Sequence, residues 1–159
     1  MRIRILCVGK LKERFYTEAA AEFSKRLSRF CELEIAELPD EKVKDDPSPA
    51  EIERVKSIEC KRIEDKLNAA DHVIALDPRG KQLSSEELSK ELSDLMLAGK
   101  SRLAFIIGGS HGLTQSMRDR ADAVISFSRM TFSHQIFRIM LLEQVYRAFK
   151  ILSGEPYHK

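Results

Sequence analysis

Three glycines that follow an apolar segment form the first candidate for a ligand-binding loop. Gly108, Gly109 and Gly112 occupy the pattern G-G-x-x-G directly after residues 102–107 (RLAFII). Glycine has no Cβ, so its backbone can approach a ligand closely and adopt a positive φ. The spacing differs from the G-x-G-x-x-G of dinucleotide-binding proteins, and it does not follow the first strand. It predicts either a ligand-binding loop or an ordinary tight turn between a strand and a helix.

A second candidate is the loop at residues 128–133 (SRMTFS). Small polar side chains, Ser128 and Thr131, stand there beside the apolar Met130 and Phe132. Backbone amides next to an apolar wall suit an adenine ring and its ribose. Taken alone, the same composition fits an ordinary exposed loop, which is the commoner case.

The histidines and cysteines do not form a metal-binding or nucleophilic motif. The three cysteines are scattered, with no C-x-x-C pair, so neither a disulfide framework nor a zinc site is expected. No histidine pair has metal-ligand spacing beside an acidic or cysteine partner, so we expect no metal. His134 opens the last helical segment, where it could act near a site or simply begin the helix. The other histidines are His72, His111 and His158.

Apolar periodicity predicts strands and helices that alternate along the whole chain. Such alternation indicates an α/β fold, a mainly parallel sheet with helices on both faces, in one domain covering residues 1–159. Two helices begin with capping boxes, and residues 77–83 (DPRGKQL) are expected to form a turn. The expected strands are 3–8, 33–38, 72–76, 102–107 and 122–127. The expected helices are 15–30, 49–67, 85–99, 114–120 and 134–152.

The predicted topology places the candidate loops together. In open α/β sheets, ligands bind beyond the carboxyl ends of the strands. The loops DPRGK, GGSHGL and SRMTFS each follow an expected strand. The fold should therefore bring all three to one edge of the sheet, and we expect the functional site there.

The overall composition limits the class of protein. With 159 residues, 43% of them hydrophobic, the chain can build one domain with a substantial core. Its 27 basic and 25 acidic residues give a net charge of +2, which argues against a wholly basic nucleic-acid binder but allows a local patch. Residues 72–159 carry a net +3 and seven of their basic residues are arginine. No stretch is long enough to span a membrane, and the N-terminus lacks a signal-peptide pattern, so we expect a cytoplasmic protein.

The last expected helix is unusually apolar. Twelve of the 17 positions from 136 to 152 are apolar, more than one buried face requires. The helix should therefore be buried nearly all round, either against a second copy of the chain in a homodimer, which we favour, or in the core of a monomer. The tail that follows, residues 155–159 (EPYHK), combines an aromatic ring, an imidazole and an amine.

These segments together resemble a known family. VGKLKE, DPRGK, IIGGSHGL, SFSRMTFSHQIFRIMLLEQVYRAFKI and PYHK stand in the order and spacing of the RlmH family over essentially the whole chain. Its members are 23S rRNA (pseudouridine-N3)-methyltransferases of the SPOUT class. The resemblance implies a C-terminal trefoil knot, a homodimer paired through the knot helices, and S-adenosylmethionine bound in a bent shape by the knotted loops. The implied cofactor site comprises Leu76, Gly108, Phe127, Ser128, Arg129, Met130, Thr131 and Phe132.

The implied reaction needs a proton acceptor more than a metal. The donor's methyl group is already activated, so catalysis would depend mainly on positioning and on removal of the N3 proton of the target base. The candidate acceptors of that proton are His134 and two residues of the tail, Tyr157 and His158. The tail could act within its own chain or across the dimer. Arg138 or Lys159 would stabilise the developing anion.

The resemblance also implies 23S rRNA, within the assembled ribosome, as the partner. Arg79, Lys81, Arg129 and Lys150 would contact phosphates, and binding would weaken steeply with salt. Two alternatives remain open from the sequence. One is a SPOUT methyltransferase that acts on another RNA such as tRNA, and the other is a non-catalytic α/β module that binds RNA or a nucleotide.

Overall fold

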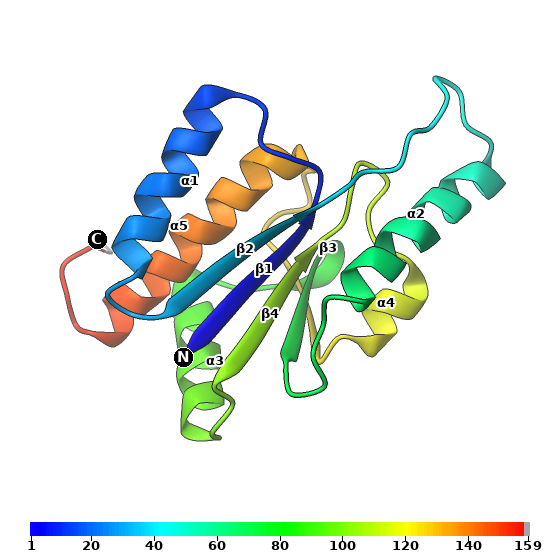
Figure 1. Cartoon of the computed structure of the whole chain (residues 1–159). Coiled ribbons are helices and arrows are strands. Elements are labelled where there is room, and N and C mark those ends of the chain that lie inside the picture. The colour runs from blue at the N-terminus through cyan, green and yellow to red at the C-terminus, as the bar shows by residue number, and fades with distance from the viewer. Residues whose placement is uncertain (158–159) are drawn as a thin grey trace.

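The computed structural model describes residues 1–157 and contains a five-stranded sheet in which all neighbouring strands are parallel. The strand order is β2-β1-β4-β3-β5 (Figure 1). The expected parallel α/β fold is confirmed. The strands are β1 (Arg2–Val8), β2 (Glu32–Leu38), β3 (His72–Gln82), β4 (Arg102–Ile107) and β5 (Ala123–Ser126). The helices are α1 (Arg14–Leu27), α2 (Pro49–Glu64), α3 (Ser85–Leu97), α4 (Gln115–Arg120) and α5 (His134–Leu152).

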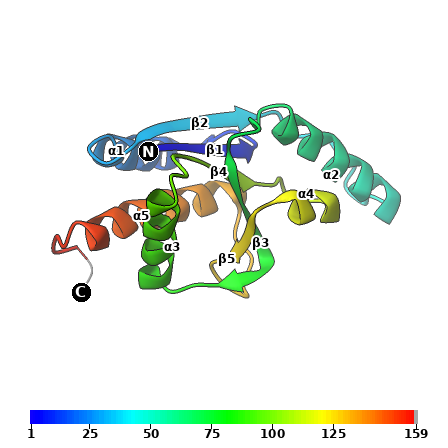
Figure 2. The same cartoon turned by 90° about the horizontal axis from the view of Figure 1, so that it is seen from below.

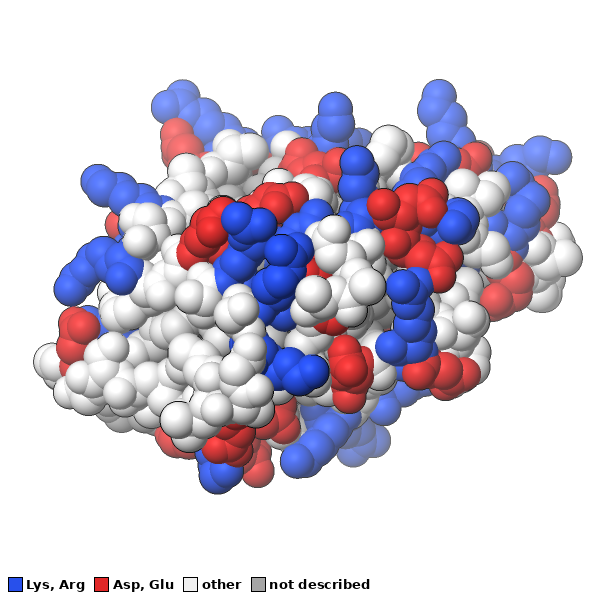
Figure 3. Space-filling model, turned by 60° about the horizontal axis from the view of Figure 1, so that its bottom comes forward, with Lys and Arg blue, Asp and Glu red and all other residues white. Residues whose placement is uncertain are grey.

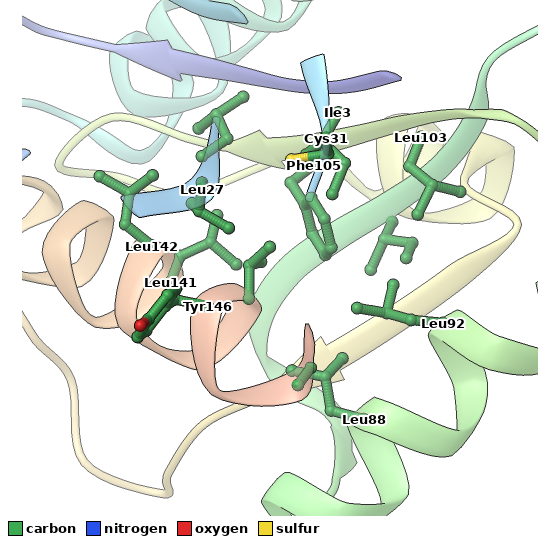
Figure 4. Close-up of a cluster of buried hydrophobic side chains, with 14 of the residues drawn as sticks. Ile3, Leu27, Cys31, Leu88, Leu92, Leu103, Phe105, Leu141, Leu142 and Tyr146 are labelled. Atoms are coloured by element: carbon green, nitrogen blue, oxygen red, sulfur yellow. The ribbon is translucent and has the colours of Figure 1, made fainter. Parts of the chain in front are cut away.

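Helices cover both faces of the sheet, as the sequence predicts. α1, α3 and α5 pack on one face, and α2 and α4 pack on the other (Figures 1 and 2). Successive side chains of a strand point to opposite faces, so Ile3 and Ile5 of β1 join the first layer while Leu6 and Val8 join the second. Figure 4 shows the larger cluster, where Phe105 of β4 lies among side chains of α3 and α5.

The predicted capping boxes fix the starts of α2 and α3. Ser48 Oγ accepts a hydrogen bond from the Glu51 N–H at 3.3 Å, and Ser84 Oγ accepts one from the Glu87 N–H at 3.1 Å. Each glutamate carboxylate accepts the backbone N–H of its serine in return. Two otherwise unpaired N–H groups are satisfied at each helix end, so the chain enters both helices at defined residues.

One expected element is wrong. The sequence predicts a turn at residues 77–83, whereas β3 continues to Gln82. The register shifts after Leu76, and the last residues of β3 pair with β5 again. Gly80 packs so closely on β5 that a Cβ would lie 2.6 Å from the carbonyl carbon of Ile125. Leu76 and Lys81 both pair with Ile125, so residues 77–80, which have the composition of a turn, form a bulge within the strand.

A buried ion cluster joins the amino ends of β1, β3 and β4. Asp71, whose side chain is fully buried, accepts hydrogen bonds from Arg4 and Arg102 at 3.1 Å each and from the Asn68 N–H at 2.9 Å. Burial alone would raise the pKa of Asp71, but these hydrogen bonds outweigh it and hold the pKa below 3.8. The carboxylate therefore stabilises the folded state above pH 3.8, and this contribution is lost as the pH falls through the lower pKa of the folded state.

We expect Asp71→Asn to lower the free energy of unfolding by about 3 kcal/mol near neutral pH, because two guanidinium groups lose a buried counter-ion. The difference from the wild type should shrink as the pH falls below 3.8, where the wild-type carboxylate also becomes protonated. Urea unfolding followed by circular dichroism measures the free energy of unfolding of the wild type and of the variant at each pH. Asp94→Asn, which removes an exposed partner of Lys90, is the control and should have a far smaller effect. An equal loss for Asp71→Asn at neutral and acidic pH would contradict the prediction.

Candidate active site

A cavity of about 730 Å³ opens at the carboxyl edge of the sheet, beyond β3, β4 and β5 and beside the start of α5. It is lined by residues 76–79, 107–113 and, except for residue 129, 126–134. The expectation that the three candidate loops meet at one edge of the sheet is confirmed. The volume lies within the range typical of small-molecule sites.

The glycine loop forms one wall of this cavity. An isolated bridge joins Gly109 and Gly112, and the Gly112 N–H donates to the Gly109 carbonyl at 2.9 Å. Gly112 has a φ of +78°, which favours glycine. A Cβ on Gly108 would lie only 2.7 Å from the carbonyl carbon of Gly112. The loop therefore closes tightly because Gly108 and Gly112 lack side chains, and their peptide groups contribute to the cavity wall.

The segment after β5 forms another wall. Ser126 Oγ donates to the carbonyl oxygen of Ser128 at 2.8 Å, which fixes the backbone as it leaves the strand. The rings of Phe127 and Phe132 both pack near Phe137 of α5, with centroid distances of 4.9 and 6.4 Å. A backbone fixed by this hydrogen bond therefore lies beside an apolar wall, and the sequence predicts that such a combination binds an adenine ring.

Three charged groups at the cavity were missed by the sequence prediction: Asp77, Arg118 and Lys56. Asp77 of β3 is buried, and it accepts hydrogen bonds from the Arg118 guanidinium at 3.2 Å and from the Arg79 N–H at 2.9 Å. Lys56 of α2 lines the same cavity. The place of Asp77 directly after an apolar run is a signal that could have identified it. No sequence signal connects Lys56 or Arg118 with it, because their helices meet β3 only in the folded chain.

In the part of the chain from Met1 to Tyr157, no group of three or more His, Cys, Asp or Glu side chains could hold a metal ion. None of the helices described there is long and apolar enough to cross a membrane. What the cavity offers is peptide groups, hydroxyls, aromatic surface and a few charged side chains.

A family model described as a predicted SPOUT methyltransferase matches residues 1–158. The chain belongs to the SPOUT methyltransferase family. It is also similar along its whole length to curated proteins named ribosomal RNA large subunit methyltransferase H. Those of Clostridium perfringens, Streptococcus equi subsp. zooepidemicus and Lactobacillus johnsonii are 52%, 51% and 50% identical, each over 159 residues that cover 100% of both chains.

One solved structure shares this SPOUT chain's fold at low sequence identity. It is that of a probable methylase family protein from Haemophilus influenzae Rd KW20, with a TM-score of 0.56 and 12% identity. The match covers 99% of this chain and 70% of that chain. At such identity the likeness supports the fold alone.

The SPOUT family uses S-adenosylmethionine, and the residues at the cavity fit this donor. Leu76 and Phe127 offer apolar contact for an adenine ring, and the glycine loop offers peptide groups for its polar edge. Arg129, one of the eight positions that the resemblance assigns to the donor, is exposed and is not among the lining residues. The other seven line the cavity: Leu76, Gly108, Phe127, Ser128, Met130, Thr131 and Phe132.

Arg138, expected among the catalytic residues of this SPOUT chain, is fully buried and does not line the cavity. Its guanidinium donates to the carboxylate of Glu37 and, at 2.8 Å, to the carbonyl of Gly9. Gly9 has a φ of +85°, and a Cβ on it would lie 2.7 Å from Nε2 of His134. The ring of His134 therefore packs against the bare backbone of Gly9 and itself lines the cavity. Arg138 lies behind the cavity wall, where it supports that contact.

The tail folds back onto α5. The ring of Tyr157 meets Tyr146 edge-on with centroids 4.9 Å apart, and the Arg147 guanidinium carbon lies 5.0 Å from the Tyr157 centroid. The Tyr157 hydroxyl donates to the Glu143 carboxylate at 3.3 Å. Burial and the nearby Glu143 charge raise the pKa of Tyr157 above 10. The hydroxyl is therefore protonated at neutral pH and acts as a hydrogen-bond donor.

Within one chain, the docked tail lies far from the cavity. His134 and Tyr146 are 12 residues apart on α5, which corresponds to about 18 Å of helix length. Tyr157 packs on Tyr146, whereas His134 lines the cavity. His158, the other predicted tail residue, lies outside the described residues.

Proposed function

We propose that the chain methylates N3 of a pseudouridine in 23S rRNA, using S-adenosylmethionine, as a homodimer on the assembled ribosome in the cytoplasm. The observation that carries the proposal is the cavity at the carboxyl edge of the sheet, lined by seven of the eight residues that the resemblance assigns to the donor. Full-length relatives named ribosomal RNA large subunit methyltransferase H support the choice of RNA.

The chain's own contribution would be binding and orientation. When bound, the donor supplies a methyl group activated on a positively charged sulfur. Leu76, Phe127 and the peptide groups around Gly108 would hold it. The target base must leave its stack to reach such a pocket. Much of the rate enhancement would then come from holding the base nitrogen in line with the methyl group.

The surface of α3 and α5 supports a homodimer. A second hollow of about 570 Å³ lies between them and is lined mainly by apolar side chains, among them Phe23, Leu88 and Ile139. Ile136 is 38% exposed there, so α5 is not buried all round within one chain. Figure 3 shows mixed charges and, at its lower left, a broad uncharged area. A second copy covering this surface would complete the burial that the helix's composition predicts. The trefoil knot implied by the resemblance is part of the same proposal.

The distance between tail and cavity favours an active site shared between two chains. The tail of one subunit, docked near Tyr146, could lie over the cavity of the other if α5 packs against its copy in opposite sense. Tyr157 and His158 would then close the pocket over the target base. Because Arg138 is buried behind the wall, we assign it a supporting role in this arrangement.

The proposal is tested by methyl transfer from radiolabelled S-adenosylmethionine to purified large subunits, assembled ribosomes and tRNA. Mass spectrometry of nuclease digests would identify the modified nucleotide. We expect label in 23S rRNA as a methylated pseudouridine. Label in tRNA would identify a SPOUT methyltransferase with another substrate. Donor binding by calorimetry without transfer to any RNA would favour a non-catalytic binding module.

Exposed basic side chains near the cavity should contribute to ribosome binding. Lys81 lies in β3 beyond the register shift and is exposed. We expect Lys81→Ala to weaken binding and to make the slope of log K against log salt shallower by about 1, because one phosphate contact is lost. Filter binding at a series of salt concentrations measures this slope. Lys90→Ala is the control, since Lys90 pairs with Asp94 on α3. Identical slopes for wild type and Lys81→Ala would contradict the prediction.

A further inference from the structure

The proposed reaction needs a group that accepts the N3 proton of the target base. Lysine and arginine are protonated at neutral pH and cannot accept a proton. Both carboxylate oxygens of Asp77 already accept hydrogen bonds, one from the Arg118 guanidinium and one from the Arg79 N–H. Among residues 1–157, two imidazoles at the cavity remain as candidates, His111 and His134. The ionisable side chains that line the cavity are Lys56, Asp77, Arg79, His111, Arg118 and His134.

His134 lies at the cavity wall with Nε2 turned toward Gly9, which leaves Nδ1 for a ligand. It is the first residue of α5, and its ring packs against the backbone of Gly9. Within residues 1–157, no hydrogen bond links its imidazole to another side chain or to the backbone. Because Nε2 packs against Gly9, Nδ1 is the nitrogen of this partly buried imidazole that can bond to a ligand in the cavity. His111 sits in the glycine loop, on the side of the cavity toward Glu59 of α2.

The surroundings of His134 favour its neutral form. Burial lowers the pKa of His134 below 6.5, and the Arg138 guanidinium on the same helix lowers it further. Lys12, after β1, acts in the same direction, while Asp40, after β2, acts in the opposite one. At neutral pH the ring therefore carries a free lone pair, as a proton acceptor requires.

We propose that His134 accepts the N3 proton of the target base during methyl transfer, and that Arg138 is the positioning residue that holds it in place through Gly9. This rests on the proposed function. A bond forms between N3 and the methyl carbon, and the carbon–sulfur bond breaks with its electron pair left on sulfur. The N3 proton passes to the imidazole of His134 and from there to solvent. The tail then serves to hold the target base rather than to take its proton.

The support of His134 passes through a chain of three groups. The Arg138 guanidinium bridges the Glu37 carboxylate and the Gly9 carbonyl. Because Gly9 lacks a Cβ and has a positive φ, its backbone can lie directly against the ring. Loss of this support would move the imidazole without removing its basicity. A displaced ring would lower the rate of transfer but leave the site for the donor intact.

The test compares single-turnover methyl transfer by wild type and His134→Asn on assembled ribosomes, with saturating donor, between about pH 6 and about pH 9. The wild-type rate should be level above pH 6.5, since the acceptor is then neutral. For His134→Asn, we expect a rate about 100-fold lower near neutral pH that rises tenfold per pH unit as hydroxide replaces the imidazole. Donor affinity measured by calorimetry should stay within about threefold of wild type.

Four further variants complete the test. Gly9→Ala should lower the rate and keep donor affinity, because its Cβ would displace the His134 ring. His72→Asn is the matched control, since His72 lies at the amino end of β3 beside Asp122, and it should behave as wild type. A level, near-wild-type profile for His134→Asn would overturn the proposal. So would the sloping profile in His111→Asn or His158→Asn instead. A wild-type protein that transfers no methyl group would instead refute the proposed function.

Discussion

Replacing Gly108 with alanine is expected to lower the affinity for S-adenosylmethionine by about 100-fold or more, the size of effect seen when binding geometry is lost at a site. An alanine Cβ would lie 2.7 Å from the carbonyl carbon and 2.8 Å from the oxygen of Gly112, and both are backbone atoms that no side-chain rotation can move away. The loop must therefore open. The bridge between Gly109 and Gly112 would be strained, and the peptide groups on the cavity wall would shift.

Calorimetric titration with S-adenosylmethionine measures the affinity of Gly108→Ala, and thermal unfolding shows whether the variant is folded. Gly99→Ala is the matched control. Gly99 ends α3 with a φ of +73° and has no heavy atom within 4 Å of a built Cβ. Its replacement should cost about 1 kcal/mol of stability, because alanine disfavours positive φ, and leave donor affinity unchanged. A folded Gly108→Ala protein with wild-type affinity would exclude the glycine loop from the donor site.

Removing residues 157–159 is expected to lower methyl transfer by about 100-fold or more while sparing donor binding, because the target base would lose the groups that close over it. Donor binding should survive because Tyr157 packs on Tyr146, about 18 Å along α5 from the cavity of the same chain. Single-turnover transfer to assembled ribosomes and calorimetry with the donor separate the two effects.

A substitution in the tail provides the comparison. Tyr157→Phe keeps the ring contacts with Tyr146 and Arg147 and removes only the hydrogen bond to Glu143. We expect it to retain most of the transfer rate if ring packing orders the tail. Full activity of the truncated chain would show that the tail plays no part in the reaction. Loss of donor binding on truncation would show that the tail supports the donor site instead.

The elements and the edge of the sheet that carries the site could be predicted from the sequence. Strand and helix periodicities are local properties, and serine caps such as Ser48 and Ser84 mark helix starts within four residues. Parallel strands place all their carboxyl ends at one edge, so three loops that follow strands must meet there. The cavity confirms that these three loops lie together, because residues 77–79, 108–113 and, except for residue 129, 128–133 line it.

The structure around the site could not be predicted in the same way, because it depends on contacts between distant parts of the chain. The turn composition at residues 77–80 gave the wrong element because the flanking residues Leu76 and Lys81 both pair with Ile125 of β5, more than 40 residues later, and make the segment a bulge within β3. Sequence reasoning placed Arg138 among catalytic groups, yet the fold buries it between Glu37 of β2 and Gly9 after β1. The partner of a charged side chain is set by whichever residues the fold brings near.

The sequence by itself determined the fold class, the family and the edge at which the site lies, because periodicity, caps and motif order are properties of short stretches of chain. Only the tertiary structure decided how the site is built. It brought Asp77, Arg118 and Lys56 to the cavity from three elements and docked Tyr157 far along α5. It also set Nε2 of His134 against Gly9, which leaves Nδ1 for a ligand. These outcomes depend on distances between residues up to about 130 positions apart, such as Gly9 and Arg138, which no local pattern encodes.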